Sequence, residues 1–180
     1  MKGSRIVLSL ALTLVLGLAG FAPSASASIT DQDQIAKQVR HELNMIPYVN
    51  AFDYMAFTVN PDGSVTLTGA VTNPVLKSEA NNVVKRVEGV QRVDNQIEVL
   101  PVSFFDNGLR VRLFRTIYGY PALQKYGVGI DKSIRIIVDN GHVTLIGVVN
   151  NQADKTIAGI RAGEVPGVFS VDNQLLVEKN

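Results

Sequence analysis

The sequence contains no cysteine, no tryptophan and only two histidines among its 180 residues. Without cysteine the chain cannot form disulfides, thiolate metal sites or a cysteine nucleophile, so its core must be held by packing alone. The histidines, His41 and His142, show no ligand spacing, which favours surface positions over metal binding. The sequence also lacks a P-loop and a Gly-x-Ser-x-Gly motif. We therefore predict a non-enzymatic protein with no catalytic residues, no metal and no cofactor.

The sequence also has few long apolar runs, and the longest of them, residues 6–20, lies close to the N-terminus. It follows Lys2 and Arg5 and precedes a stretch of small residues that ends in Ala25-Ser26-Ala27. This order is typical of a secretory signal peptide. We predict a signal peptide over residues 1–27, cleaved after Ala27, and a periplasmic location; an uncleaved N-terminal anchor is the alternative. Lipid attachment at such a peptide needs a cysteine, so we do not expect a lipoprotein.

An excess of either charge is also missing from the predicted mature chain, which has 15 basic and 16 acidic residues. Residues 28–103 carry three more acidic than basic side chains, whereas residues 104–180 carry two more basic than acidic ones. General nucleic-acid binding needs a strongly basic face, so we predict no nucleic-acid partner. The second half is the part that could approach an anionic surface.

What the sequence does contain is an internal repeat. Residues 63–99 return without a gap as residues 141–177, shifted by 78 positions, with 17 identities. The repeated residues are mainly Val, Gly, Thr, Leu and Asn, which form strands, turns and caps rather than catalytic sites. We assign structural roles to two pairs of repeated glycines: Gly69 and Gly147 in the strands, and Gly89 and Gly167 as caps at the ends of the helices.

Each copy predicts the order α-β-β-α-β. The first module, residues 30–100, has a helix capped by Thr30, strands at 55–59 and 65–71, a helix from Pro74 to Gly89 and a strand at 90–99. The second, residues 107–180, has a helix within 107–120, strands at 134–138 and 143–149, a helix after Asn151 and a strand at 168–177. The predicted fold class is α+β, with two tandem modules of two helices packed on a small three-stranded mixed sheet.

Two asparagines point toward the apolar face of the last strand of each module. Strand alternation places Asn95 with Val93 and Ile97, and Asn173 with its counterparts. A buried amide needs hydrogen bonds, so we predict that each one ties a loop or a helix end to the strand. Contact with a ligand is the alternative.

The best candidate for a binding surface is the first helix of the second module with its exit loop. It mixes cations with aromatic residues, which suits a phospholipid head-group surface. The alternative is an ordinary amphipathic helix with a solvated basic side and packed aromatics. The predicted lipid-binding residues, beside Phe104 and Phe105, are Arg110, Arg112, Phe114, Arg115, Tyr118, Tyr120, Lys125 and Tyr126.

The outward face of the second sheet is unusually apolar. Ile137, Ile146 and Val148 occupy positions where the first module has threonine and alanine. Such a face is usually covered, and we expect packing between the modules there; a site for apolar segments of client proteins is the alternative.

The repeat resembles a known family. A glycine-bounded strand at 63–71, an amphipathic helix and then residues 89–97 (GVQRVDNQI) resemble the BON domain, named for osmotically induced periplasmic and nodulation proteins of bacteria. Residues 141–147 and 167–175 resemble it equally. The missing lipoprotein cysteine makes the chain similar to the soluble, OsmY-like branch rather than an outer-membrane-tethered one.

That resemblance implies a helix pair on a small mixed sheet, an exported protein and no known enzymatic activity. It also implies envelope maintenance or protection from osmotic stress, through anionic phospholipid in some members and through periplasmic chaperoning in others. We therefore expect a protein that binds anionic phospholipid or the envelope surface, and the sequence identifies no small-molecule substrate. The alternative is a chaperone or interaction module for envelope protein clients.

Overall fold

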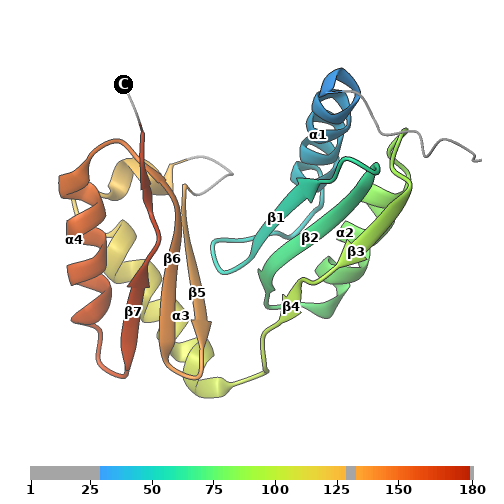
Figure 1. Ribbon diagram of the computed structural model, residues 1–180. Helices are drawn as coiled ribbons and strands as arrows, with labels where there is room; N and C mark the ends of the chain where they lie inside the picture. The colour runs from blue at the N-terminus through green and yellow to red at the C-terminus, as the bar shows by residue number, and fades with distance from the viewer. Residues whose placement is uncertain (1–28, 129–132, 179–180) are drawn as a thin grey trace, which may run out of the picture.

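The computed structural model describes residues 29–128 and 133–178, and the predicted signal peptide lies outside them. The described residues form two modules with the same order of α-helices and strands, joined by a short linker that runs from the first sheet to the base of the second (Figure 1). The bounds are α1 (Ile29–Asn44), β1 (Tyr54–Val59), β2 (Ser64–Val71), α2 (Pro74–Lys85), β3 (Arg92–Asn95), β4 (Glu98–Val99), α3 (Phe104–Tyr118), the 3-10 helix η1 (Gln124–Gly127), β5 (Ile134–Asp139), β6 (His142–Val149), α4 (Gln152–Gly163), β7 (Ser170–Asn173) and β8 (Leu176–Val177).

The central strand of each sheet has an antiparallel neighbour on one side and parallel neighbours on the other. β1 pairs with β2 so that Phe57 lies opposite Leu67, and β5 pairs with β6 so that Ile136 lies opposite Leu145. β3 and β4 both run parallel to β2, as β7 and β8 do to β6. This confirms the predicted α+β class with mixed sheets, and β1 and β5 are edge strands in equivalent positions.

Two local expectations about element bounds need correction. The last strand of each module is split into two short strands, although the backbone N–H groups of Gln96 and Gln174, which lie between the halves, still bond to the carbonyls of Leu67 and Leu145 in the central strands. Thr30 lies inside α1 rather than at its cap.

The caps assigned to Gly89 and Gly167 also need correction. The residue that ends α2 is Arg86 and the one that ends α4 is Glu164, both in right-handed helical geometry, so each glycine lies three residues beyond its helix cap. Gly89 and Gly167 are exposed and sit in the turn that leads into the last strand, with φ values of 88° and 99°. The helices stop earlier than predicted because a short turn, rather than a single glycine, connects them to the sheet. The Asn73 cap at the start of α2 is as expected.

The two repeated asparagines bridge the break in the last strand to the neighbouring helix. Asn95 donates to the carbonyl of Lys77 in α2 at 2.8 Å and accepts from the backbone of Ile97. Asn173 donates in the same way to Lys155 in α4 at 2.7 Å and accepts from Leu175. Each amide therefore joins the last strand to the second helix.

A glycine in each central strand permits close approach of the edge strand. Gly69 and Gly147 have φ values of 118° and 136°. A Cβ atom on Gly147 would lie 1.9 Å from the carbonyl oxygen of Ser133, and one on Gly69 would lie 2.2 Å from that of Tyr54. Side chains cannot be accommodated at these positions.

The modules touch through a turn of the first module that reaches the edge of the second sheet (Figure 1). The carbonyl of Ala51 accepts a hydrogen bond from the backbone N–H of Ile136 at 2.7 Å, and Arg135 donates to the carbonyl of Asn50 at 2.9 Å. Phe52 packs edge-on against Phe114, with ring centroids 6.1 Å apart. Ala51 is buried in the second core, so residues 50–53 belong structurally to both modules.

Candidate functional site

Two of the predicted lipid-binding residues close the edge of β5 instead of facing solvent. The Arg110 guanidinium is buried and donates to the carbonyl of Val138 at 2.6 Å and to Asn107 at 2.7 Å. The Tyr118 hydroxyl is also buried and donates to the carbonyl of Ile134. Burial raises the pKa of Tyr118 to about 12 and lowers the pKa of Arg110. Their expected exposure was wrong, because an edge strand needs partners for its outward carbonyls.

The residues of the exit loop form a second polar cluster. The buried Tyr126 hydroxyl donates to Asp154 at 2.6 Å and accepts from the backbone of Asn150 at 2.8 Å, and Lys125 pairs with the same carboxylate at 2.8 Å. Burial alone would raise the pKa of Asp154, but hydrogen bonds from Lys125 and Tyr126 outweigh it and lower that pKa. This cluster anchors the loop to the N-terminus of α4.

The two remaining aromatics of the predicted set also make internal contacts. Phe114 is half-buried between Phe52 and Tyr118, and Tyr120 is half-buried beneath the guanidinium of Arg161, 5.2 Å from its ring centroid. Of the eight predicted residues, Arg112, Arg115 and Lys125 are exposed, and Lys125 is held by its ion pair with Asp154. The hypothesis of lipid contact therefore rests on the two arginines and on what lies beside them.

Beside them lies an exposed group of apolar side chains at the base of the second module. Its members are Val102 (94% exposed), Phe104 (96%), Phe105 (49%) and Phe169 (72%), which we call the aromatic patch. Phe105 and Phe169 stack with centroids 6.3 Å apart, and Arg112 donates to the carbonyl of Pro166 at 3.4 Å on the same surface. Stacked exposed phenylalanines beside a cation, with two further exposed apolar residues next to them in the chain, are typical of an interaction site rather than of a solvated surface.

Gly167 lies within this surface, so its role differs from that of its counterpart Gly89. A Cβ atom on Gly167 would lie 3.1 Å from the ring of Phe105 and 3.4 Å from the guanidinium of Arg112. A Cβ atom on Gly89 would instead lie 3.0 Å from Ile35, a residue of the first core. The purely structural role predicted for Gly167 is therefore incomplete, because its bare backbone lets the patch and Arg112 pack closely together.

The patch is held by a cap that joins α3 to the β5–β6 turn. Asp106, fully buried, accepts from the backbone N–H groups of Asn140 and Gly141 at 3.1 and 2.9 Å, and its own N–H donates to the Ser103 hydroxyl. The ring of His142 lies 6.0 Å from that of Phe169. Three segments distant in sequence thus converge on one end of the module.

Sequence reasoning found Phe104 and Phe105 but missed Phe169. The signal was available in the repeat, because the position equivalent to Phe169 in the first module is Gln91. An aromatic residue at a position that is polar in the other copy marks a module-specific surface. Differences between the two copies therefore carry functional information that their identities do not.

The expected client face of the second sheet is only partly open. Ile137 is buried, whereas Val148 is exposed and lines a cleft of about 360 Å³ with Arg135 and residues of the first module, among them Val49 and Tyr54. In this part of the chain the modules therefore face each other.

Neither a metal site nor a membrane span is found in the described residues. They contain no group of three or more His, Cys, Asp or Glu side chains that could hold a metal ion. No helix in residues 29–128 or 133–178 has the length and apolar character needed to cross a bilayer.

Comparison with known proteins identifies one family. The BON domain model matches residues 31–101 and 123–179. No curated protein is significantly similar in sequence. Among solved structures, the C-terminal domain of CdsD, a structural protein of the type III secretion system of Chlamydia trachomatis, is 15% identical over 83% of this chain and 100% of that domain, with a TM-score of 0.29. A second CdsD structure is 14% identical over 81% of this chain and 94% of the other, also with a TM-score of 0.29.

Proposed function

The chain belongs to the BON domain family, and we propose that it is an exported, non-enzymatic protein whose second module binds anionic phospholipid. The aromatic patch beside Arg112 and Arg115 is the observation that supports this most directly. BON domains are generally non-catalytic binding modules. A periplasmic location, with cleavage after Ala27, is part of the proposal because it would bring the protein to the envelope surface.

The geometry of α3 supports contact with a lipid head-group layer. Phe105, Arg112 and Arg115 are separated by seven and three residues, so they share one helix face. The phenylalanines can enter the head-group boundary while the arginines meet lipid phosphates, each worth about 1 kcal/mol near an anionic leaflet. The net acidic first module has no equivalent combination among its described residues.

Co-sedimentation with vesicles tests the proposal in two parts. Vesicles of phosphatidylglycerol and phosphatidylcholine should bind the protein at low salt, and vesicles of phosphatidylcholine alone should bind it weakly. Reversing both arginines, Arg112→Glu with Arg115→Glu, should weaken binding by about thirtyfold or more, because at least about 2 kcal/mol of attraction is removed. Replacing Phe104 and Phe169 with serine should remove the part of the binding that survives high salt.

The matched control reverses two exposed cations of the first module, Lys37→Glu with Lys85→Glu. It changes the net charge equally but should leave vesicle binding within about twofold, since these residues lie outside the proposed surface. Equal losses for the two pairs would show a response to net charge only. Absence of binding to phosphatidylglycerol vesicles by the unaltered protein would refute the proposal.

A further inference from the structure

The two equivalent edge strands differ in how well they are covered. The inward side chains of β5 are fully buried, with exposures of 0% at Ile134, Ile136 and Val138. Their counterparts in β1 are all only half-buried, and these are Met55, Phe57 and Val59. The same pleated apolar face is therefore closed in one module and open in the other.

Substitutions on the first helix of each module account for the difference. The buried rows of α1 (Ile35, Val39, Leu43) and α3 (Leu109, Leu113, Ile117) align the two helices. Under this alignment Ala36 of α1 corresponds to Arg110 of α3, and Asn44 corresponds to Tyr118. Arg40 corresponds to Phe114. The two side chains that hold the β5 edge are thus replaced by short ones, which cannot reach the strand to make the same bonds.

The backbone of β1 is left open by the same changes. Along an antiparallel pair of strands, every second pair of opposite residues is hydrogen-bonded. Asn60 and Ser64 form such a bonded pair, so Phe57, which lies three positions before Asn60, belongs to a non-bonded pair. The backbone N–H and C=O of Phe57 therefore point away from β2. In β5 the equivalent outward groups bond to Ala51, Arg110 and Tyr118. Among the residues that the structure describes, no partner is found for the outward groups of Met55, Phe57 and Val59.

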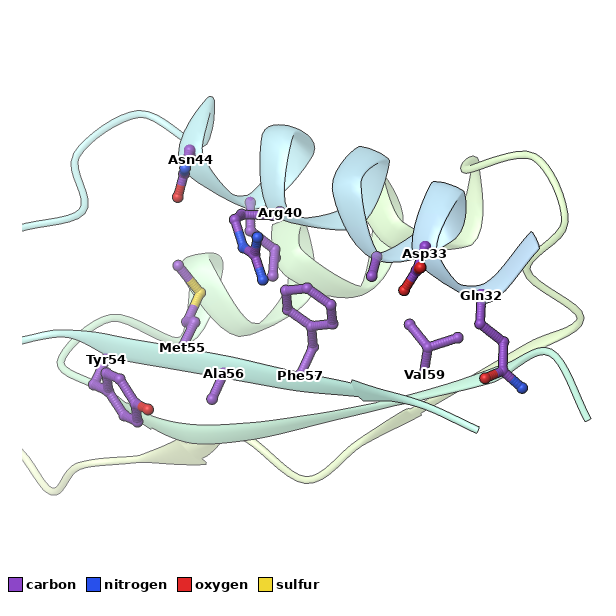
Figure 2. A pocket seen from close by; sticks show the side chains of 11 residues that line it. Gln32, Asp33, Arg40, Asn44, Tyr54, Met55, Ala56, Phe57 and Val59 are labelled. Carbon is purple, nitrogen blue, oxygen red and sulfur yellow. The ribbon is translucent and has the colours of Figure 1, made fainter. Parts of the chain in front are cut away.

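A groove of about 620 Å³ runs between α1 and this open edge (Figure 2). Met55, Phe57 and Val59 point from β1 toward the helix, while Tyr54 and Ala56 point to the other side of the strand. The Arg40 guanidinium lies over the ring of Phe57, 5.8 Å from its centroid, and is itself exposed. The groove therefore has an apolar floor at strand spacing and a row of backbone donors and acceptors along one side.

We infer that this groove, which is separate from the proposed lipid surface, binds an extended segment of another polypeptide as an added strand beside β1. A strand supplies N–H and C=O groups at the spacing of the edge, and alternate apolar side chains would fill the floor. A lipid head group does not offer alternating donors and acceptors at the spacing of a strand, and the net acidic module would repel anionic lipid. The equivalent edge, that of β5, already pairs with polypeptide backbone, because the N–H of Ile136 donates to the carbonyl of Ala51. The occupant is thus a segment with alternating apolar and polar residues, as in an unpaired strand of an incompletely folded β-rich protein.

Fluorescence anisotropy of a labelled peptide tests the inference on the full chain. The probe is a peptide of about twelve residues in which valine alternates with threonine between terminal lysines. The unaltered protein should bind it, and methylation of alternate backbone nitrogens should weaken binding by about tenfold, because main-chain pairing is lost. On binding, the amide of Phe57 should become protected from hydrogen exchange.

The decisive variant gives the first module the two side chains that cover the edge strand in the second module. Ala36→Arg with Asn44→Tyr should remove peptide binding while thermal melting stays the same or rises. Gln38→Arg with Met45→Tyr places the same side chains on and beside α1 outside the groove and should leave binding unchanged. Equal binding by the closed variant, or equal binding of the methylated peptide, would overturn the inference. If the unaltered protein forms a dimer that the closed variant does not form, the groove would be assigned to a second copy of the chain. If the closed variant loses vesicle binding, the groove would be assigned to lipid. Either result would also overturn the inference.

Discussion

At the scale of the residue, Tyr118 shows how one hydroxyl can make an edge strand and a helix interdependent. Its burial, where it donates to Ile134, raises its pKa to about 12, against about 10 in the unfolded chain. Between these values the unfolded state loses the phenolic proton and the folded state keeps it. The stabilisation from this group is therefore complete below about pH 10 and is lost as the pH rises toward 12.

Urea unfolding at a series of pH values measures this loss. Over the two-unit window the contribution of Tyr118 amounts to about 3 kcal/mol, so the free energy of unfolding should fall more steeply in the unaltered protein than in Tyr118→Phe. The variant should already be about 1 kcal/mol less stable near neutral pH, because the carbonyl of Ile134 loses its donor. Parallel pH profiles for the two proteins would contradict the assigned environment.

At the scale of the element, the broken last strand of each module depends on one amide. Asn95→Leu and Asn173→Leu should each destabilise the protein by about 1 to 3 kcal/mol, because a helix carbonyl and a strand N–H are left unpaired inside. Chemical unfolding measures the change. The adjacent exposed glutamines provide controls, and Gln96→Leu or Gln174→Leu should change stability by no more than about 0.5 kcal/mol. Unchanged stability in both asparagine variants would reduce these amides to incidental contacts.

Much of this element structure was predictable from the repeat, since paired identities fix strand register and Asn73 with Pro74 marks a helix start. The break after Asn95 was not, because Val93, Asn95, Ile97 and Val99 alternate without interruption and alternation does not report backbone pairing.

The candidate site was predictable only in part. In the sequence Arg110 and Tyr118 look like surface residues. Their burial follows from their hydrogen bonds to the outward carbonyls of β5, which are tertiary contacts that the sequence does not show. Gly167 likewise matches Gly89 in the sequence, yet it packs beside Phe105 and Arg112 because the second module carries side chains at that end that the first lacks. Identity between copies therefore predicts backbone geometry but not what covers it.

At the scale of the whole molecule, the turn at residues 50–53 sets how the modules sit together. It closes the second sheet with a side chain, Phe52, and with backbone bonds at Ala51 and Asn50. The same turn leads into the strand whose own edge remains open. One copy of the repeat thus completes the other, and its own groove stays free for a different chain.

This arrangement predicts that the coupling between modules can be loosened without unfolding either one. Phe52→Ala with Arg135→Ala removes the ring contact with Phe114 and the bond to Asn50, but keeps the linker before Phe104, the packing of Ala51 in the second core and its backbone bond to Ile136. Small-angle scattering should then show a larger radius of gyration, while circular dichroism keeps the same secondary structure. Tyr48→Ala, at an exposed position in the same loop, should leave the radius unchanged. A double variant as compact as the unaltered protein would mean that the aromatic and guanidinium contacts do not fix the orientation of the modules, and that Ala51, with its packing and its bond to Ile136, suffices.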